Sequence, residues 1–317
     1  MVNPLAAPLR SSAASALLCV IMGSTQLAAQ DARPPEPQPQ MQALIGDYAS
    51  GREVVYVSEV NGQLRVRTSA FRSYPANHPG ITLDSNSVTV NGRRYLRRDV
   101  AQGTFRINPV RPVEQLRVEA LAASPPPQPD TLLKPDLVEL RSLDPTIRYD
   151  IRYATTNNFM SSVFYSQPRA FLQRPAAEAV VRAHKRLSAF GYGLLIHDAY
   201  RPWYVTKMFW DATPDSLHDF VADPRAGSRH NRGAAVDLTL FDLRTGQPIE
   251  MPSGYDEFSS RAYPEYPGGA SRQRWHRELL RRVMEEEGFR VYAFEWWHFD
   301  YGQWRRYPVL NRRFEDL

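Results

Sequence analysis

Two histidines and one aspartate, carried by two short segments, could together hold a metal ion. His230 and Asp237 belong to the run Ser228-Arg-His-Asn-Arg-Gly-Ala-Ala-Val-Asp237, and His298 ends the run Glu295-Trp-Trp-His298. Three protein ligands leave the fourth position of zinc open for water, which is typical of catalytic rather than structural sites. The sequence therefore predicts a single catalytic Zn²⁺ held by His230, Asp237 and His298.

Two further residues could complete a hydrolytic site. Glu295 lies three residues before His298 and could accept a proton from a zinc-bound water, whose pKa falls to about 7, and return it to a departing amine. A tetrahedral intermediate also needs a positive donor beside its oxyanion, and Arg201 is the candidate. Arg201 could instead form a structural ion pair with Asp198, and Asp198 could serve both roles by orienting the guanidinium. This set predicts a zinc peptidase.

The spacing of these residues makes structural demands. Residues three apart in an ideal strand point to opposite faces, so Glu295 and His298 need a bulge or bend between them to reach one metal. Gly233 allows a turn that carries His230 and leads into a strand that carries Asp237. A serine hydrolase with Ser228 as nucleophile is the alternative. No Gly-x-Ser-x-Gly elbow surrounds Ser228, which is better placed to hydrogen-bond a substrate beside the metal.

The other histidines have no partner at a recognisable ligand spacing. We expect His184 and His276 on helix surfaces and His218 in a loop. His78 is expected in the N-terminal module, and His197 in a strand, facing away from Asp198.

The C-terminal part, residues 135–317, is expected to form an α+β domain, because helices alternate there with hairpin-linked strands. Proline near the first turn and glycine just past the end mark a helix at 175–190. Further helices are expected at 204–212 and 271–287, and strands at 194–198, 234–241 and 290–299.

A small all-β domain of about six strands is expected at residues 43–121. Asn61-Gly62 and Asn91-Gly92 each separate two alternating apolar runs, which is a strong hairpin signal. Proline-rich segments predict an extended tether at 30–42 and a linker at 122–134. Because this domain has no cluster of His, Asp or Glu, a packing role is favoured over a binding or lid role.

Residues 1–29 are expected to be a secretory signal peptide, with Arg10 at its start, an apolar run at 13–22 and small residues near Ala29. That run is too short to span a bilayer, and no other segment is a transmembrane candidate. The only cysteine, Cys19, lies in the run, so the mature chain is expected to have neither disulfides nor thiolate ligands. These features predict an exported, periplasmic protein.

The composition of this 317-residue chain is that of a globular protein, with 43% hydrophobic and 23% charged residues and a net charge of +5. Its arginines are scattered and form no basic stripe with interleaved aromatic residues, so no nucleic-acid partner is expected. The sequence does not indicate an oligomeric state.

From about Val138 onward, the chain resembles the zinc D-alanyl-D-alanine dipeptidases of the vancomycin-resistance type, which are related to zinc D,D-carboxypeptidases and Hedgehog-like domains. Five segments in the same order carry the resemblance: Asp150-Ile-Arg-Tyr-Ala-Thr with Asn158-Phe159, Gly193-Leu-Leu-Ile-His-Asp-Ala-Tyr-Arg-Pro202, Ser228-x-His230-x-x-Gly233-x-Ala235-x-Asp237-Leu-Thr-Leu240, Gly254-Tyr-Asp256 and Glu295-Trp-Trp-His298-Phe.

The resemblance implies the same zinc ligands, with Glu295 as catalytic base and Arg201 stabilising the transition state. It also implies that Asp256 receives the free amino group of the substrate and that Ser228 and Tyr165 line the pocket. Arg229 departs from the family, which tends to have a small residue there, and the segment after Asp256 also differs.

The expected activity is zinc-dependent hydrolysis of D-Ala-D-Ala or a related D-configured dipeptide in cell-wall peptide turnover. A zinc D,D-carboxypeptidase that trims peptidoglycan stem peptides is the first alternative. The second is a cell-wall-binding protein that keeps the fold without turnover. The presence of Glu295 beside a complete ligand set argues against this last reading, because binding alone needs no base.

Overall fold

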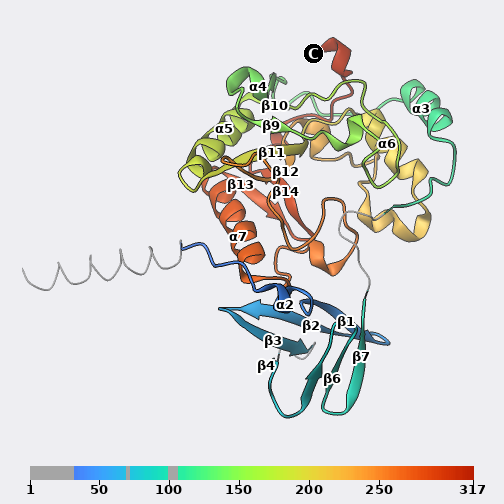
Figure 1. Cartoon of the computed structure of the whole chain (residues 1–317). Coiled ribbons are helices and arrows are strands. Elements are labelled where there is room, and N and C mark those ends of the chain that lie inside the picture. The colour runs from blue at the N-terminus through green and yellow to red at the C-terminus, as the bar shows by residue number, and fades with distance from the viewer. Residues whose placement is uncertain (1–31, 69–71, 99–105) are drawn as a thin grey trace, which may run out of the picture.

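The structure is a computed structural model that describes residues 32–68, 72–98 and 106–317 (Figure 1). The expected signal peptide and Cys19 lie outside the described residues. Most of the expected tether is without regular structure, but it contains the single helical turn α2 (Pro39–Gln42). In the described part of the chain, no helix is long and apolar enough to cross a membrane.

The N-terminal sheet is antiparallel and has seven strands in the order β4-β3-β2-β1-β7-β6-β5. Both expected hairpins are present: Asn61 and Gly62, and likewise Asn91 and Gly92, have positive φ, as the tight turns between twisted strands require. The sheet has seven strands, whereas about six were expected. Two of the seven, β4 and β5, are only three residues long, and such short strands leave little pattern in the sequence. Its strands are β1 (Gly46–Ser50), β2 (Glu53–Val60), β3 (Gln63–Thr68), β4 (Ser73–Pro75), β5 (Ile81–Leu83), β6 (Ser87–Val90) and β7 (Arg93–Arg97).

The expected extent of the all-β domain was wrong at its C-terminal end. The sheet ends at Arg97, and residues 113–122 form helix α3 (Val113–Ala122). Leu116 and Ala120 of this helix are fully buried in the hydrophobic core of the C-terminal domain. The sheet has a separate small core of Tyr48, Val55, Val57, Val66, Val88, Val90 and Tyr95.

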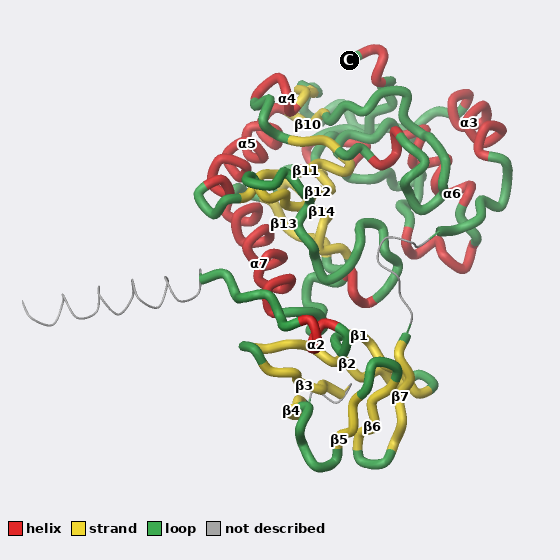
Figure 2. The backbone as a smooth tube through the Cα atoms, viewed as in Figure 1, coloured by secondary structure: helices red, strands yellow, loops and turns green. Residues whose placement is uncertain are grey.

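The C-terminal domain is built on a five-stranded sheet in the order β13-β14-β12-β11-β9 and a two-stranded sheet of β8 and β10 (Figure 2). The larger sheet is antiparallel except for the β11–β9 pair. Its strands are β9 (Arg148–Tyr149), β11 (Tyr192–Asp198), β12 (Ala235–Asp242), β13 (Phe289–Tyr292) and β14 (Glu295–Tyr301), and the smaller sheet consists of β8 (Leu137–Glu139) and β10 (Phe171–Gln173).

The helices of this domain are α4 (Leu140–Leu143), α5 (Arg174–Ser188), α6 (Trp203–Ala212) and α7 (Ser271–Glu286). Helices α5 and α7 lie side by side against the larger sheet (Figure 1). The three longer helices begin and end within two residues of their expected bounds. The strand expected at 290–299 is instead two strands, β13 and β14, joined by a tight turn.

The prediction that His184 and His276 lie on helix surfaces was wrong. Each is 4% exposed and turns toward the sheet. Nδ1 of His184 accepts the Leu194 N–H at 3.0 Å, and Nε2 of His276 lies 2.8 Å from the Tyr192 hydroxyl. Their charged sequence neighbours suggested exposure, but burial depends on the tertiary packing of the helix, and even Arg277 beside His276 is buried.

Candidate metal centre

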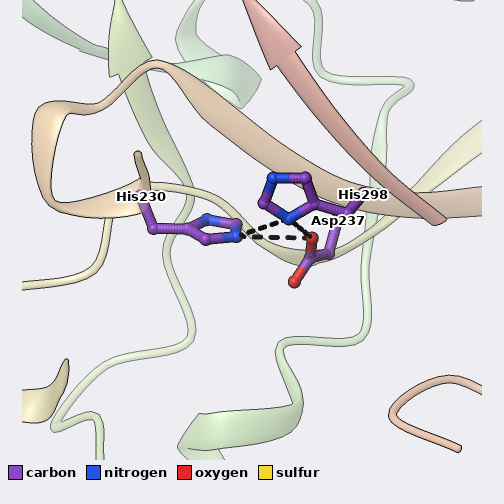
Figure 3. A group of neighbouring side chains, drawn as sticks. All are labelled: His230, Asp237 and His298. Carbon is purple, nitrogen blue, oxygen red and sulfur yellow. Dashed lines mark hydrogen bonds and ion pairs between the residues drawn. The ribbon is translucent and has the colours of Figure 1, made fainter. Parts of the chain in front are cut away.

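His230, Asp237 and His298 meet in a buried group (Figure 3). Nε2 of His230 is 3.1 Å from Nδ1 of His298 and 3.4 Å from Oδ1 of Asp237, and that Nδ1 is 3.0 Å from the same oxygen. Tetrahedral zinc with bonds near 2.0–2.1 Å separates its ligand atoms by about 3.3 Å. The three atoms therefore already have the spacing of a tetrahedral zinc face.

The backbone explains this convergence. Asp237 on β12 and His298 on β14 are direct cross-strand partners. His230 begins a 3₁₀ turn (His230–Arg232) that ends at Gly233 with φ +62°, so the chain reverses from the turn into β12. A Cβ atom on Gly233 would lie 2.4 Å from the Leu137 side chain, so both the backbone conformation and the space require glycine here.

The side chains of Glu295 and His298 both reach the metal-binding group, because an irregularity in the pairing of β13 with β14 lies between them. The β13–β14 register shifts between Val291, which pairs with Phe299, and Tyr292, which pairs with Glu295. Oε2 of Glu295 consequently lies 3.7 Å from Nδ1 of His298. Burial raises the pKa of Glu295, although the imidazole of His298 opposes the shift. A raised pKa suits a group that must take up and release a proton near neutral pH.

Each ligand is held on the side that faces away from the metal position. His230 donates from Nδ1 to the Ala199 carbonyl at 2.7 Å, and His298 donates from Nε2 to Asp300 at 2.9 Å. Oδ2 of Asp237 accepts the Tyr255 hydroxyl at 2.9 Å. The remaining oxygen, Oδ1, is buried and accepts no hydrogen bond from the described residues.

An orphaned carboxylate oxygen facing two imidazole nitrogens fits a cation, because such buried groups are otherwise costly. Burial opposes the charge of Asp237, but the neighbouring His230 and His298 hold its pKa below the usual range. Burial likewise opposes a charged His298, yet the neighbouring carboxylates of Asp237 and Asp300 raise its pKa to about 10. A metal would replace that proton, as metal ions do at imidazole ligands.

Arg201 and Asp198 form a buried ion pair beside this group. Oδ2 of Asp198 accepts Nε of Arg201 at 3.0 Å and Nη2 at 2.7 Å. The guanidinium lies 4.8 Å from the ring centre of Phe209 and 5.2 Å from that of Tyr153. Burial disfavours the charge, but Asp198 raises the pKa of Arg201 well above its ordinary value. Arg201 is thus a fixed cation in the pocket wall, and Asp198 is the residue that orients it.

Asp256 lies in the pocket wall in a left-handed backbone conformation, with φ 57°. Its Oδ2 accepts the Tyr153 hydroxyl at 2.9 Å. Burial raises the pKa of Asp256 well above its ordinary value, and the charge of Asp237 adds to this effect. A cation brought into the pocket would reverse that shift, so the carboxylate is suited to meet an ammonium group.

The two remaining expected pocket residues lie in different places. Ser228 lines the pocket, and its hydroxyl accepts the His230 N–H at 3.2 Å. Tyr165 is buried and is not among the pocket-lining residues. Its hydroxyl donates to Asp198 at 2.6 Å, so Tyr165 supports the carboxylate behind Arg201 instead of touching a substrate.

The sequence reasoning missed Tyr153, Tyr255 and Asp300, which hold Asp256, Asp237 and His298 respectively. Two of them stood in segments quoted for the resemblance, and Asp300 lies two residues after a ligand, on the same face of its strand. Arg229, the departure from the family, places Nε 3.2 Å from Oδ2 of Asp300 and its guanidinium over the rings of Tyr292 and Trp304.

The pocket around this site has a volume of about 910 Å³, and its lining combines charged and aromatic residues. Three of the aromatic lining residues are 40–54% exposed: Phe220, Tyr263 and Phe294.

Comparison with known proteins identifies the C-terminal domain. A family model described as Peptidase_M15, D-ala-D-ala dipeptidase, matches residues 134–317, which is more than half of the chain. The chain belongs to the Peptidase_M15 family. It is therefore a metallopeptidase, and its buried His-Asp-His group can bind a metal.

Two proteins similar to this chain are named D-alanyl-D-alanine dipeptidase. That of Escherichia coli (strain K12) is 35% identical over 179 residues, covering 56% of this chain and 91% of the relative. That of Enterococcus faecalis (strain ATCC 700802 / V583) is 34% identical over 171 residues, covering 48% and 85%. Among solved structures, the LdcB LD-carboxypeptidase aligns with a TM-score of 0.33 at 17% identity, over 60% of this chain and 80% of that one.

Proposed function

We propose that this M15 peptidase is a zinc-dependent dipeptidase that hydrolyses D-Ala-D-Ala or a related D-configured dipeptide. The observation that carries the proposal is the buried group of His230, Asp237 and His298, each presenting one ligand atom, with Glu295 beside it. The relatives that carry the dipeptidase name support the choice of substrate. Bound zinc would polarise the scissile carbonyl and activate a water molecule.

The protein's own residues would do the remaining work. Glu295 would take the proton of the attacking water and deliver it to the leaving amine. Arg201, held by Asp198, would stabilise the oxyanion of the tetrahedral intermediate. Asp256 would bind the free amino group, which measures a dipeptide from its N-terminus, and Ser228 would hydrogen-bond the bound substrate.

One observation favours the second candidate, a zinc D,D-carboxypeptidase acting on peptidoglycan stem peptides. Pockets of ~300–1,000 Å³ enclose drug-sized ligands, and the volume of about 910 Å³ found here is large for a dipeptide with two methyl side chains. Asp256 argues for the dipeptidase, because a longer peptide has no ammonium group at that position. For either reaction in the cell wall, we infer that the protein is exported, with the periplasm as its compartment.

The test is release of D-alanine by the zinc-loaded protein from D-Ala-D-Ala, its N-acetylated form and a pentapeptide stem. We expect cleavage of the free dipeptide alone. Cleavage of the N-acetylated dipeptide or of the pentapeptide would instead show that the protein is a carboxypeptidase. Glu295→Gln, which keeps the shape of the side chain, is expected to lower kcat by about 10²–10⁴-fold while zinc still binds. Zinc-dependent release from none of the three would refute the proposed substrate.

A further inference from the structure

The segment between β12 and α7 connects the pocket to the N-terminal β domain. It supplies Asp256, Phe258 and Tyr263 to the pocket wall. Apart from a single 3₁₀ turn at Ser260–Ala262, residues 252–270 have no regular secondary structure. We call residues 252–270 the substrate loop. Such a loop needs external contacts to hold one conformation, because its backbone lacks the ladder of bonds that fixes a helix or strand.

The far end of the substrate loop is fixed by β1 and β2. The Tyr266 hydroxyl donates a hydrogen bond to Asp47 of β1, and both residues are buried, at 4% and 6% exposure. The Tyr266 ring also meets Tyr56 of β2 edge-on at 5.6 Å. Gly269 forms a parallel bridge with Ser58, and its carbonyl accepts the Glu59 N–H at 3.2 Å. The loop is therefore attached to the β domain at two points.

Glu59 of β2 extends this attachment to the start of α7. It is 2% exposed, and its Oε2 accepts the N–H of Ser271, the first residue of α7, at 2.8 Å. Its carbonyl accepts the Ser271 hydroxyl at 3.0 Å and an Arg274 N–H at 2.6 Å. A carboxylate at a helix N-terminus interacts favourably with the free N–H groups and the helix dipole. Gln273 of α7 accepts only the Ala270 N–H, at 2.8 Å, and Ala270 itself has no side-chain acceptor, so the β domain provides the acceptor for the Ser271 N–H.

A second buried carboxylate, that of Glu257, fixes the part of the substrate loop that is nearest to the pocket. Glu257 is 3% exposed and lies 3.2 Å from Nε of Arg261, while it accepts the Gly254 N–H at 3.1 Å and the Ser259 hydroxyl at 2.6 Å. Asp256 lies inside the segment closed by these contacts. Its left-handed backbone is unfavourable for a residue with a side chain and persists only where the surroundings fix it.

We propose that the N-terminal β domain positions the substrate loop, with Asp47 and Glu59 holding Tyr266 and Gly269–Ser271 so that Asp256 faces the pocket in one conformation. This inference rests on the proposed function for the role of Asp256. Asp47, Glu59 and Tyr266 are positioning residues and touch no substrate. The domain therefore acts on substrate affinity through the loop, and it leaves the chemistry at the metal group unchanged.

The kinetic test compares Tyr266→Phe and Asp47→Ala with Asp47→Asn, which keeps a hydrogen-bond acceptor. Loss of one buried hydrogen bond is worth roughly 1 kcal/mol, so the first two variants are expected to raise KM for D-Ala-D-Ala by about fivefold at nearly constant kcat. Asp47→Asn should stay close to the parent protein. Tyr74→Phe, in β4 away from the loop, is the matched control. A fall in kcat with loss of zinc, or an unchanged KM, would overturn the proposal.

A second readout does not depend on activity. Hydrogen exchange is expected to speed up at the amides of residues 252–270 in Tyr266→Phe and Asp47→Ala, and to stay unchanged in β12 and β14. Equal exchange in the loop for parent and variants would overturn the positioning role. If the parent protein cleaves no D-alanyl substrate, the proposed function fails, while the exchange experiment still decides whether the β domain holds the loop.

Discussion

At the scale of single residues, the outer hydrogen bonds decide which atoms face the metal. His230 donates from Nδ1 to a backbone carbonyl and His298 from Nε2 to Asp300, so the two histidines present opposite ring nitrogens. A histidine is fixed in its tautomer and orientation by the partner of its second nitrogen. The ligand geometry therefore depends on residues that never touch the metal.

Asp300 is the most direct test of this dependence. Asp300→Ala removes the acceptor for Nε2 of His298, and we expect zinc affinity to fall by about 10–100-fold, as is usual when an outer partner of a ligand is lost. Competition with a chelator measures the affinity. Asp215→Ala, whose side chain is fully exposed, is the control and should bind zinc like the parent. Equal affinity in Asp300→Ala would show that the ring is fixed by other contacts.

Arg201 is predicted to act on the transition state through its geometry as well as its charge. Arg201→Lys keeps a cation but loses the two-point contact with Asp198, and lysine cannot reproduce that fork. We expect kcat to fall by about 10²–10³-fold, the cost of losing one oxyanion donor, with little change in zinc affinity. Steady-state kinetics and metal titration measure both quantities. A variant with parent-like kcat would assign Arg201 a structural role only.

At the scale of elements, the sequence predicted the turns and helix ends that depend on the local preferences of glycine, asparagine and proline. Asn-Gly turns marked both hairpins, and proline and glycine marked the ends of α5. The failures came from tertiary context. Helix α3 depends on burial of Leu116 and Ala120 against another domain, and the inward-facing His184 and His276 depend on hydrogen bonds to β11. The need for an irregularity before His298 was predictable from spacing, but its place in the register was not, because pairing joins distant segments.

Gly233 is the element-scale position whose replacement we expect to be most damaging. Gly233→Ala forces a side chain into φ +62° and places Cβ 2.4 Å from Leu137. The backbone strain alone costs about 1–2 kcal/mol, and the overlap adds to it. Denaturant unfolding measures the loss, and zinc affinity should fall with it because the 3₁₀ turn carries His230. Gly51→Ala has the same φ but open space around it, so it isolates the strain. Equal losses in both variants would show that the overlap relaxes freely.

At the scale of the whole molecule, α7 contacts the β domain, the segment before that domain, and strand β11. The β domain caps its first residue through Glu59. The segment before the β domain contacts the same helix, where Arg272 pairs with Glu36 and donates to the Pro34 carbonyl. Arg33 donates to the Tyr192 hydroxyl, which also meets His276. The placement of the β domain therefore depends on groups inside the C-terminal domain.

His276 makes this junction sensitive to acid. Burial lowers its pKa from 6.5 to about 4, and Arg272 and Arg33 add to the shift. Its Nδ1 is buried without a partner among the described residues. Because the unfolded chain binds the proton more tightly, the stability is complete above pH 6.5 and is lost as the pH falls from 6.5 toward 4. From pH 7.5 to pH 5 the expected loss is about 2 kcal/mol, at 1.36 kcal/mol for each pKa unit.

The comparison of the parent protein with His276→Gln isolates this contribution. Glutamine can still hydrogen-bond Tyr192 but does not titrate, so the variant should lose about 2 kcal/mol less than the parent between pH 7.5 and pH 5. Urea unfolding of both metal-free proteins at several pH values gives the two profiles, and the titration of the metal ligands cancels in their difference. Parallel profiles would mean that His276 accepts its proton within the folded protein.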